Sequence, residues 1–368
     1  MKLGGITVLD LSTFLPGPYL TLAMADHGAQ VIKVENPDGG DPGRHIGPSE
    51  LGHTVFFRNL NRGKRSIALD LKTPEGREAL LKLCETADVF IESFRPGVMD
   101  RLGVGYDQVK ERNPAIIYCS ISAYGQDGPY RDRPAHDLGV EAQAGLLSMT
   151  LGEDDRPALP GVPVADLLAG LQGLAGVLMA LYRRQATGLG DYLDIGMHDA
   201  VLAGCLNILG PAMAESRQPV AKHERTTGGS AFYRTYETRD GRFIALAGQE
   251  PKFVRALLEA LGRQDLIPLC ERGPGPHQQP VVDVLAAHFK RLDLAYWDEL
   301  LQQLNICYGV VKSLPEALDD PNIVSRQMVW RDSSGLRHIG NPIRFRNEPA
   351  QPHPEAPLLG ADNERLVK

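Results

Sequence analysis

Three ionisable residues stand in separate segments that suit the presentation of a side chain to a cleft. They are His136 in Pro-Ala-His-Asp, Asp166 in Gly-Val-Pro-Val-Ala-Asp and Glu250 in Gln-Glu-Pro-Lys-Phe. Each stands close to proline or glycine at an expected loop-to-helix junction, where a scaffold can hold binding and catalytic groups. An imidazole and a carboxylate that face one carbon atom from opposite sides can remove its proton on one face and return it on the other. These residue types therefore indicate acid–base chemistry at a carbon next to a carbonyl group.

Each of these residues also has an ordinary structural alternative. Asp166 precedes a long apolar segment, so it fits the N-cap of a helix, where aspartate is among the best residues. Asp137, beside His136, has the same alternative. Glu250 stands before Pro251, where an acidic side chain favours the start of a helix. A lone histidine near a helix start is more often a surface residue than a catalyst. Residue type alone leaves both interpretations open.

Basic residues form a second group of candidates. The densest cluster is Asn-Arg-Gly-Lys-Arg-Ser at residues 61–66, and Lys72, Arg95 and Arg101 follow near later strand-to-helix junctions. Positive groups at the carboxyl ends of parallel strands suit a ligand that carries phosphate. The alternative is a solvated surface with scattered ion pairs.

The elements that would position these residues alternate between short apolar strands and helices. The expected strands are residues 6–11, 31–34, 66–69, 89–91, 116–120 and 192–195. The expected helices are residues 19–27, a segment from Thr73 as N-cap to about residue 87, and residues 167–184, with Gly188 able to end the last one. This alternation predicts an open parallel α/β sheet with helices on both faces.

The character of the chain changes beyond about residue 225. Asp240-Gly241 between two apolar segments predicts a β-hairpin, and a helix is expected at residues 251–261. We therefore expect a Rossmann-like large domain at 1–195, a linker helix region at 196–224 and a small α+β domain at 225–325. Residues 326–368 are expected to return to the large domain as a C-terminal segment.

Composition limits the classes of function. The chain has 368 residues, of which 43% are hydrophobic and 23% charged, as in ordinary globular proteins. The net charge of -7 disfavours non-specific binding to nucleic acid. Apolar runs such as Leu174 to Leu181 are too short to span a bilayer, and the N-terminus lacks a signal-peptide pattern. We expect a cytoplasmic protein with no membrane or nucleic-acid partner.

Several common cofactor and metal motifs are missing from the sequence. The five cysteines are scattered and include no Cys-x-x-Cys, which argues against a disulfide framework and a zinc site. No pair of candidate ligands has metal-binding spacing, so no metal is expected. The first turn, Leu15-Pro16-Gly17-Pro18, lacks the Gly-x-Gly-x-x-Gly of dinucleotide-binding proteins. Gly-x-Ser-x-Gly, the most recognisable serine-hydrolase motif, is also missing.

Motifs along most of the chain resemble those of the class III (CaiB/BaiF-type) CoA-transferase and α-methylacyl-CoA racemase superfamily. They occur in the same order at residues 8–11, 16–18, 22–35, 61–75, 87–92, 95–97, 122–129 and 187–191. This resemblance implies a Rossmann-like large domain and a small domain within an interlocked homodimer. It also implies an acyl-CoA substrate and no cofactor beyond the CoA moiety of that substrate.

The resemblance implies roles for individual residues. His136 matches the racemase histidine, and Glu250 matches the glutamate that supports it. Asp166 falls at the aspartate that racemases use as an acid or base and transferases use as a nucleophile. The implied CoA contacts are Phe14 and Leu69 at the adenine pocket, together with Lys72, Arg95 and Arg101.

The three matched residues favour a racemase that interconverts (2R)- and (2S)-2-methylacyl-CoA by 1,1-proton transfer through an enolate. In this hypothesis His136 and Asp166 act on opposite faces, and Glu250, assisted by Asp137, orients the imidazole. The alternative is a CoA-transferase that moves CoA between carboxylic acids through an aspartyl-CoA intermediate on Asp166. Residues 161–166 are closer to the transferases than to typical racemases. A third interpretation is a non-catalytic acyl-CoA-binding protein.

Overall fold

The computed structural model describes residues 1–367, which divide into two compact units. Unit 1 comprises Met1–Ala144, Pro160–Gly204 and the segment from Asp319 onward, and unit 2 comprises Gly145–Leu159 and Cys205–Leu318. The domain limits expected near residues 195, 224 and 325 stay a prediction.

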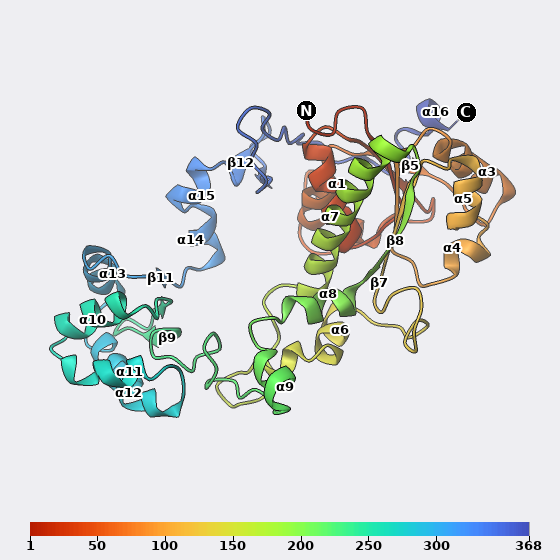
Figure 1. The fold of residues 1–368 in the computed structure, drawn as a ribbon. Helices are drawn as coiled ribbons and strands as arrows, with labels where there is room; N and C mark the ends of the chain where they lie inside the picture. The colour runs from red at the N-terminus through yellow and green to blue at the C-terminus, as the bar shows by residue number, and fades with distance from the viewer. Residues whose placement is uncertain (368) are drawn as a thin grey trace. The chain divides into compact units, whose positions relative to one another are not determined.

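Six parallel strands form one open sheet in unit 1, in the order β5-β2-β1-β6-β7-β8 (Figure 1). They are β1 (Thr7–Asp10), β2 (Gln30–Glu35), β5 (Arg65–Ala68), β6 (Val89–Glu92), β7 (Ile117–Ser122) and β8 (Asp191–Gly196). Each strand runs parallel to its neighbours. All six overlap the segments predicted as strands, so the prediction of an open parallel α/β sheet is confirmed.

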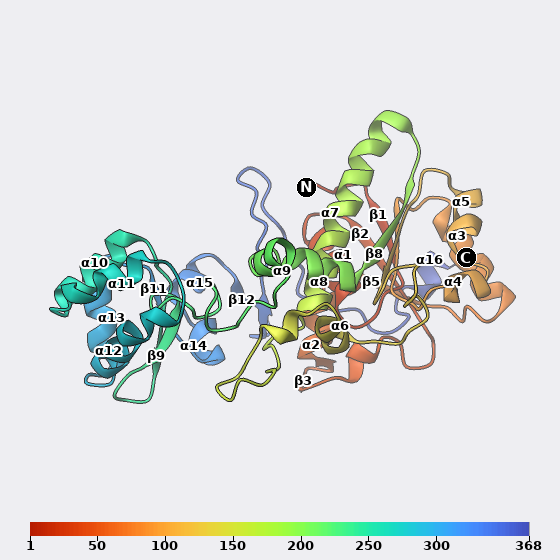
Figure 2. The same cartoon turned by 60° about the horizontal axis from the view of Figure 1, so that its bottom comes forward.

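Helices cover both faces of this sheet (Figures 1 and 2). One face carries α1 (Pro16–Asp26) and α7 (Val164–Thr187), and the other carries α3 (Pro74–Cys84), α4 (Val98–Arg101) and α5 (Tyr106–Arg112). The remaining elements of unit 1 are η1 (Pro42–His45), β3 (Ser49–Glu50), β4 (His53–Thr54), α2 (Val55–Asn61), α6 (Asp137–Gln143), α8 (Met197–Gly204), α15 (Pro321–Ser325), β12 (Val329–Arg331), β13 (Arg337–Ile339) and α16 (Asn363–Leu366). The last helix, α16, contacts the edge strand β5, where Asn363 Oδ1 accepts a hydrogen bond from Ala68 N at 2.8 Å.

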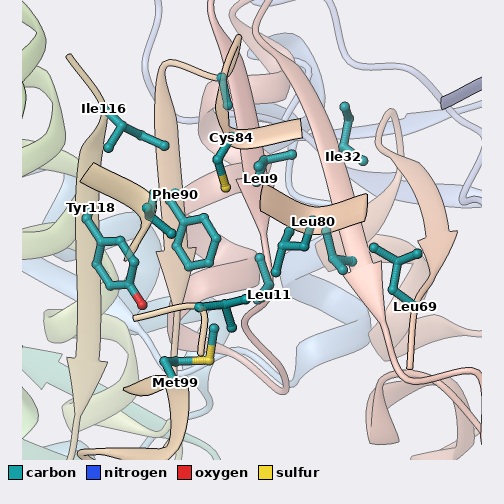
Figure 3. Packing of buried hydrophobic residues seen from close by; sticks show 14 of the residues in the cluster. Leu9, Leu11, Ile32, Leu69, Leu80, Cys84, Phe90, Met99, Ile116 and Tyr118 are labelled. Carbon is teal, nitrogen blue, oxygen red and sulfur yellow. The ribbon is translucent and has the colours of Figure 1, made fainter. Parts of the chain in front are cut away.

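A hydrophobic core fills the space between the sheet and helices α3 and α5 (Figure 3). Leu9 and Phe90 of the strands and Leu80 and Cys84 of α3 are fully buried there. Thr73 starts α3, because its hydroxyl accepts a hydrogen bond from Gly76 N at 3.1 Å. The predicted N-cap is confirmed, and it fixes where the apolar face of α3 begins.

Helix α7 has 24 residues and lies directly against α1. It ends where predicted, at Gly188, whose φ of +71° forms a left-handed C-cap. Gly170 allows the close approach to α1, because a Cβ at this position would lie 2.7 Å from the carbonyl oxygen of Pro16. The glycine therefore sets the distance between the start of α1 and the first turns of α7.

By length and composition, α7 is the one helix in the described residues that could cross a membrane, with a mean hydropathy of 1.8. The apolar run from Leu174 to Leu181, too short by itself to span a bilayer, lies inside this longer apolar helix. Core helices of soluble proteins pass the same test, and α7 packs against α1, β7 and β8. Its length and composition are thus weak evidence for a membrane span.

Unit 2 contains an antiparallel sheet in the order β11-β10-β9 and a set of short helices. The strands are β9 (Arg234–Glu237), β10 (Phe243–Leu246) and β11 (Tyr308–Val310). The helices are η2 (Leu146–Ser148), α9 (Gly210–Glu215), α10 (Pro251–Ala260), η3 (Gln264–Leu266), α11 (Ile267–Glu271), η4 (Pro276–Gln278), α12 (Gln279–Phe289), α13 (Leu294–Gln303) and α14 (Leu314–Leu318). Strands β9 and β10 form the hairpin predicted at Asp240-Gly241, where Gly241 has a φ of +75°.

Candidate active site

A cavity of about 520 Å³ lies in unit 1 at the carboxyl ends of the central strands. The strand order reverses here, because β1 leads to β2 on one side and β6 leads to β7 on the other. Such a switch point leaves a crevice in which α/β proteins bind ligands. The cavity lining includes Thr13, Phe14 and Leu15 after β1, Ser93, Phe94 and Arg95 after β6, Arg131, Arg133, His136 and Asp137 around the start of α6, and Asp166 in α7.

Asp166 belongs to the first turn of α7, and its side chain is half-buried in the wall of the cavity. Two acidic residues of α6 satisfy backbone groups at this helix start: Asp137 Oδ1 accepts from Asp166 N at 3.1 Å, and Glu141 Oε1 accepts from Val164 N at 2.9 Å. The N-cap position itself is Pro163. The capping alternative for Asp166 is therefore wrong, and its carboxylate is available to the cavity.

Three carboxyl groups, those of Asp137, Glu141 and Asp166, meet at this junction. Burial, followed by the negative charges of Asp137 and Glu141, raises the pKa of Asp166 to about 7. Glu141 is fully buried, and burial together with Asp137 raises its pKa as well. A carboxyl group with a pKa near neutrality can serve as a base, an acid or a nucleophile under physiological conditions.

His136 stands immediately before α6 and lines the same cavity as Asp166. Its ring meets the ring of Phe14 edge-on, with the centroids 6.2 Å apart and the planes at 80°. The structure thus brings together His136, Asp166 and Phe14 from three segments. The carboxylate of Asp137 accepts a hydrogen bond from the backbone N–H of Asp166. The expected role of Asp137 in orienting the His136 imidazole stays a prediction.

Glu250 lies in unit 2, where it occupies the N-cap position of α10 and is exposed. Its side chain makes no capping hydrogen bond; its backbone carbonyl accepts from Phe253 N at 2.9 Å. This placement agrees with the helix start expected at Pro251. The predicted support of His136 by Glu250 stays a prediction.

The residues expected to bind CoA occupy different environments. Phe14 and Arg95 line the cavity, whereas Leu69 is only 7% exposed and belongs to the hydrophobic core. Lys72 is exposed just before α3. Arg101 lies close to the cavity wall. A Cβ atom added to Gly97 would lie 3.1 Å from Arg101 Nη1 and 3.2 Å from Arg131 Nη2, and Arg131 lines the cavity, so the two guanidinium groups are near neighbours.

Two arginines of the cavity were not identified from the sequence. Arg131 donates through Nε to the carbonyl oxygen of Gln126 at 2.9 Å, and the guanidinium of Arg133 lies 4.7 Å from the ring centroid of Tyr130. Both arginines lie within five residues of His136 in the sequence Arg-Asp-Arg-Pro-Ala-His, and this closeness could have identified them as cavity residues. Among the described residues, no group of three or more His, Cys, Asp or Glu side chains is arranged to hold a metal ion.

A family model and several curated relatives match most or all of this chain. The model of the family described as CoA-transferase family III matches residues 3–363. Succinyl-CoA:glutarate CoA-transferase of Mus musculus is 31% identical, and the alignment covers 100% of this chain and 86% of the relative. Acetyl-CoA:oxalate CoA-transferase of Acetobacter aceti is 32% identical, with 99% and 94% covered. Both relatives carry the names of CoA-transferases.

Solved structures agree with this relationship. A CAIB/BAIF family protein from Brucella suis has a TM-score of 0.85 and 29% identity, over 98% of this chain and 97% of that chain. A hypothetical protein from Mycobacterium tuberculosis has a TM-score of 0.84 and 28% identity, over 98% of each chain. With the same fold, relatives above 30% identity and a family match over nearly its whole length, this chain belongs to CoA-transferase family III.

Proposed function

We propose that this protein transfers CoA from an acyl-CoA thioester to a carboxylic acid and that Asp166 is the nucleophile. The observation that carries the proposal is the carboxylate of Asp166, which faces a ligand-sized cavity and has a pKa raised to about 7. The sequence favoured the racemase reaction first. The relatives described above are named as CoA-transferases, and this favours the transferase alternative.

The proposed reaction proceeds through covalent steps on Asp166. The ionised carboxylate attacks the thioester carbonyl and expels the CoA thiolate, which gives a mixed anhydride. The thiolate attacks the aspartyl carbonyl of the anhydride, releases the donor acid and leaves an aspartyl-CoA thioester. The acceptor carboxylate then attacks this thioester, and the returning thiolate takes the new acyl group and frees Asp166. No oxidant, reductant or metal ion is consumed in this sequence.

The surrounding carboxyl groups suit Asp166 for this role. Because burial, Asp137 and Glu141 disfavour its ionised form, the carboxylate is more basic than an exposed aspartate once it has lost its proton. A more basic oxygen is the stronger nucleophile toward a thioester carbonyl. His136 lines the same cavity. We propose that its imidazole donates a hydrogen bond to the oxyanion that forms during each attack.

Arginines in the cavity suggest the class of acid. Arg133 lines the cavity and makes no ion pair with any described residue, and its guanidinium lies 4.7 Å from the ring centroid of Tyr130. A guanidinium exposed in a cavity suits a carboxylate ligand. The names of the relatives include glutarate and oxalate, so we propose a dicarboxylic acid as one of the two substrates.

The racemase reaction remains a second candidate because His136 and Asp166 line one cavity.

Two incubations distinguish CoA transfer from racemisation. In the first, the protein is mixed with succinyl-CoA without an acceptor and its intact mass is measured. A CoA adduct that is missing in Asp166→Asn supports transfer, and the proposal is wrong if neither an adduct nor transfer to glutarate or oxalate occurs. In the second, deuterium incorporation at C2 of (2R)-2-methylacyl-CoA in deuterated water, without an acceptor, would establish the racemase.

A further inference from the structure

The turn after β1 is held in a conformation that its sequence does not favour. Phe14 has a φ of +61°, which is rare for a bulky residue other than glycine. Such strain persists only where the surrounding structure enforces it, and it concentrates at functional sites. Here the strained residue lines the cavity and meets the ring of His136. Other groups of unit 1 must therefore enforce this conformation.

Side chains from other elements hold the backbone of this turn at four consecutive points. The hydrogen bonds are Ser12 N to Asp10 Oδ1 at 3.1 Å, Lys33 Nζ to the carbonyl oxygen of Ser12 at 2.9 Å, Thr13 N to Ser93 Oγ at 3.1 Å, and Phe14 N to Asp41 Oδ1 at 3.4 Å. Turns at a protein surface normally leave most of these groups to water. This turn is instead enforced by the interior of unit 1.

Two of the holding groups form a buried ion pair. Lys33 Nζ lies 2.8 Å from Asp41 Oδ2, and the two side chains are 0% and 1% exposed. Beneath them Asp10 pairs with Lys64 at 3.0 Å, and both of these side chains are 0% exposed. Burying charges has a large desolvation cost, and replacing such pairs with apolar residues is often neutral or stabilising. Asp41 also caps η1, where its Oδ1 accepts from Gly43 N at 2.7 Å. That cap does not require the charge of Lys33, whereas both members of the pair contact the turn directly.

The other side of the turn is bounded by α7. The carbonyl oxygen of Pro16 comes so close to α7 that a Cβ on Gly170 would lie 2.7 Å from it. Gly170 is one helical turn after Asp166 and therefore lies on the same side of α7. The start of α1 is thus confined between the Lys33–Asp41 pair and the helix that carries Asp166.

We propose that Lys33 and Asp41 are positioning residues of the active site, which act by holding residues 12–16 so that Phe14 is fixed beside His136 and Pro16 against the helix of Asp166. Neither residue touches the cavity. Their effect on the reaction passes through the backbone of Ser12 and Phe14. The kinetic test of this role rests on the proposed function, because it needs the CoA-transfer assay. The NMR test does not depend on activity.

The test compares two matched variants. Asp41→Asn removes one charge from the Lys33 pair, and Asp26→Asn removes one charge from the equally buried pair between Asp26 and Arg62, whose side chains are 2% and 0% exposed. Both variants are expected to lower Tm. Because misplacement by 1 Å can cost about 100-fold in rate, only Asp41→Asn is expected to lower kcat per folded enzyme, by roughly 10- to 100-fold. Equal kcat in the two variants would overturn the proposal.

The ring of His136 provides the measurement that needs no substrate. Its imidazole proton signals in NMR depend on the ring of Phe14, so they should move in Asp41→Asn and stay in place in Asp26→Asn. If wild type shows no CoA transfer, the proposed function fails while this comparison still decides the positioning role. If the His136 signals do not move in Asp41→Asn, the positioning role of Asp41 is wrong. If Asp41→Asn does not fold, Asp41→Glu and Asp26→Glu provide the same comparison with the charge retained.

Discussion

At the scale of single residues, the chemistry of the site depends on carboxyl groups that share one junction. Asp137 and Glu141 hold the first N–H groups of α7, and their charges act on Asp166 two residues into the helix. The same two residues therefore have a structural and an electrostatic effect. The electrostatic effect does not depend on which reaction the enzyme catalyses, so it can be tested through the pH dependence of activity.

Replacing Asp137 with asparagine should shift the pH dependence of activity. The asparagine side chain keeps an oxygen that can accept from Asp166 N but removes a negative charge, so the pKa of Asp166 should fall from its raised value of about 7. Since the nucleophile acts when ionised, the acidic limb of kcat/KM should move to lower pH. Rate profiles from pH 5 to 9 check this, with Glu111→Gln on the exposed surface of α5 as the unshifted control. An unchanged limb in Asp137→Asn would mean that another group controls it.

Asp166→Asn should separate activity from stability. Loss of the nucleophile should lower turnover by about 10,000-fold or more. The pKa of Asp166 is raised from 3.8 to about 7 in the folded protein, so the folded state holds this proton more tightly than the unfolded chain. The stability that this provides is complete below about pH 4 and is lost as the pH rises toward 7. An asparagine cannot ionise, so Tm should exceed that of wild type by a few degrees at pH 8 and converge with it near pH 4. A Tm difference independent of pH, measured by thermal unfolding, would argue against the raised pKa.

At the scale of elements, the site is a product of how α1 and α7 approach each other. The two helices touch at Gly170 and Pro16, close to the strained turn on one helix and to Asp166 on the other. A change in the distance between the helices would move both walls of the cavity. The contact is between a glycine and a backbone carbonyl, so it has little freedom to adjust.

Gly170→Ala tests this contact directly. The new methyl group would lie 2.7 Å from the carbonyl oxygen of Pro16, and one of the two helices must shift. We expect a loss of about 1–3 kcal/mol in the free energy of unfolding and a clear fall in kcat. Gly210→Ala at the start of α9 is the control, because no atom lies within 4 Å of its added methyl group. Denaturant unfolding and steady-state kinetics check both variants, and wild-type values for Gly170→Ala would exclude a tight helix contact.

At the scale of the whole molecule, one face of α7 remains exposed and apolar in the single chain. Leu171, Leu178, Met179 and Tyr182 are 46%, 39%, 66% and 79% exposed. A contiguous exposed apolar surface of this kind is typical of a protein interface. The resemblance to the superfamily led us to expect a homodimer, and we propose that a second copy covers this face. The expected cytoplasmic location, without a nucleic-acid or membrane partner, stays a prediction.

The dimer proposal predicts a change in mass in solution. Wild type should sediment as a dimer, and Met179→Glu with Tyr182→Glu should shift the equilibrium toward monomer while the circular dichroism spectrum is unchanged. The reason is that burying two added carboxylates in an apolar interface costs several kcal/mol. Analytical ultracentrifugation measures this, with exposed Leu314→Glu of unit 2 as the control. A wild-type monomer at micromolar concentration would contradict the proposal.

The sequence by itself determined many of the elements of this protein, though not all of them. The six strands of unit 1, the N-cap at Thr73 and the hairpin at Asp240-Gly241 follow from apolar runs, caps and turn residues within a few positions of one another. These signals are local, because a strand or a cap depends on neighbouring residues. The resemblance added His136 and Asp166 as a pair, although 30 positions separate them.

Only the tertiary structure decided how the site is built. The contacts of Asp137 and Glu141 with the start of α7 and the left-handed conformation of Phe14 have no local pattern in the chain. Each depends on side chains from distant segments. Phe14 in particular adopts a backbone conformation that its own residue type disfavours, since Lys33 and Asp41 enforce it from the interior. Local preference sets the elements, and long-range contacts override that preference where the cavity is formed.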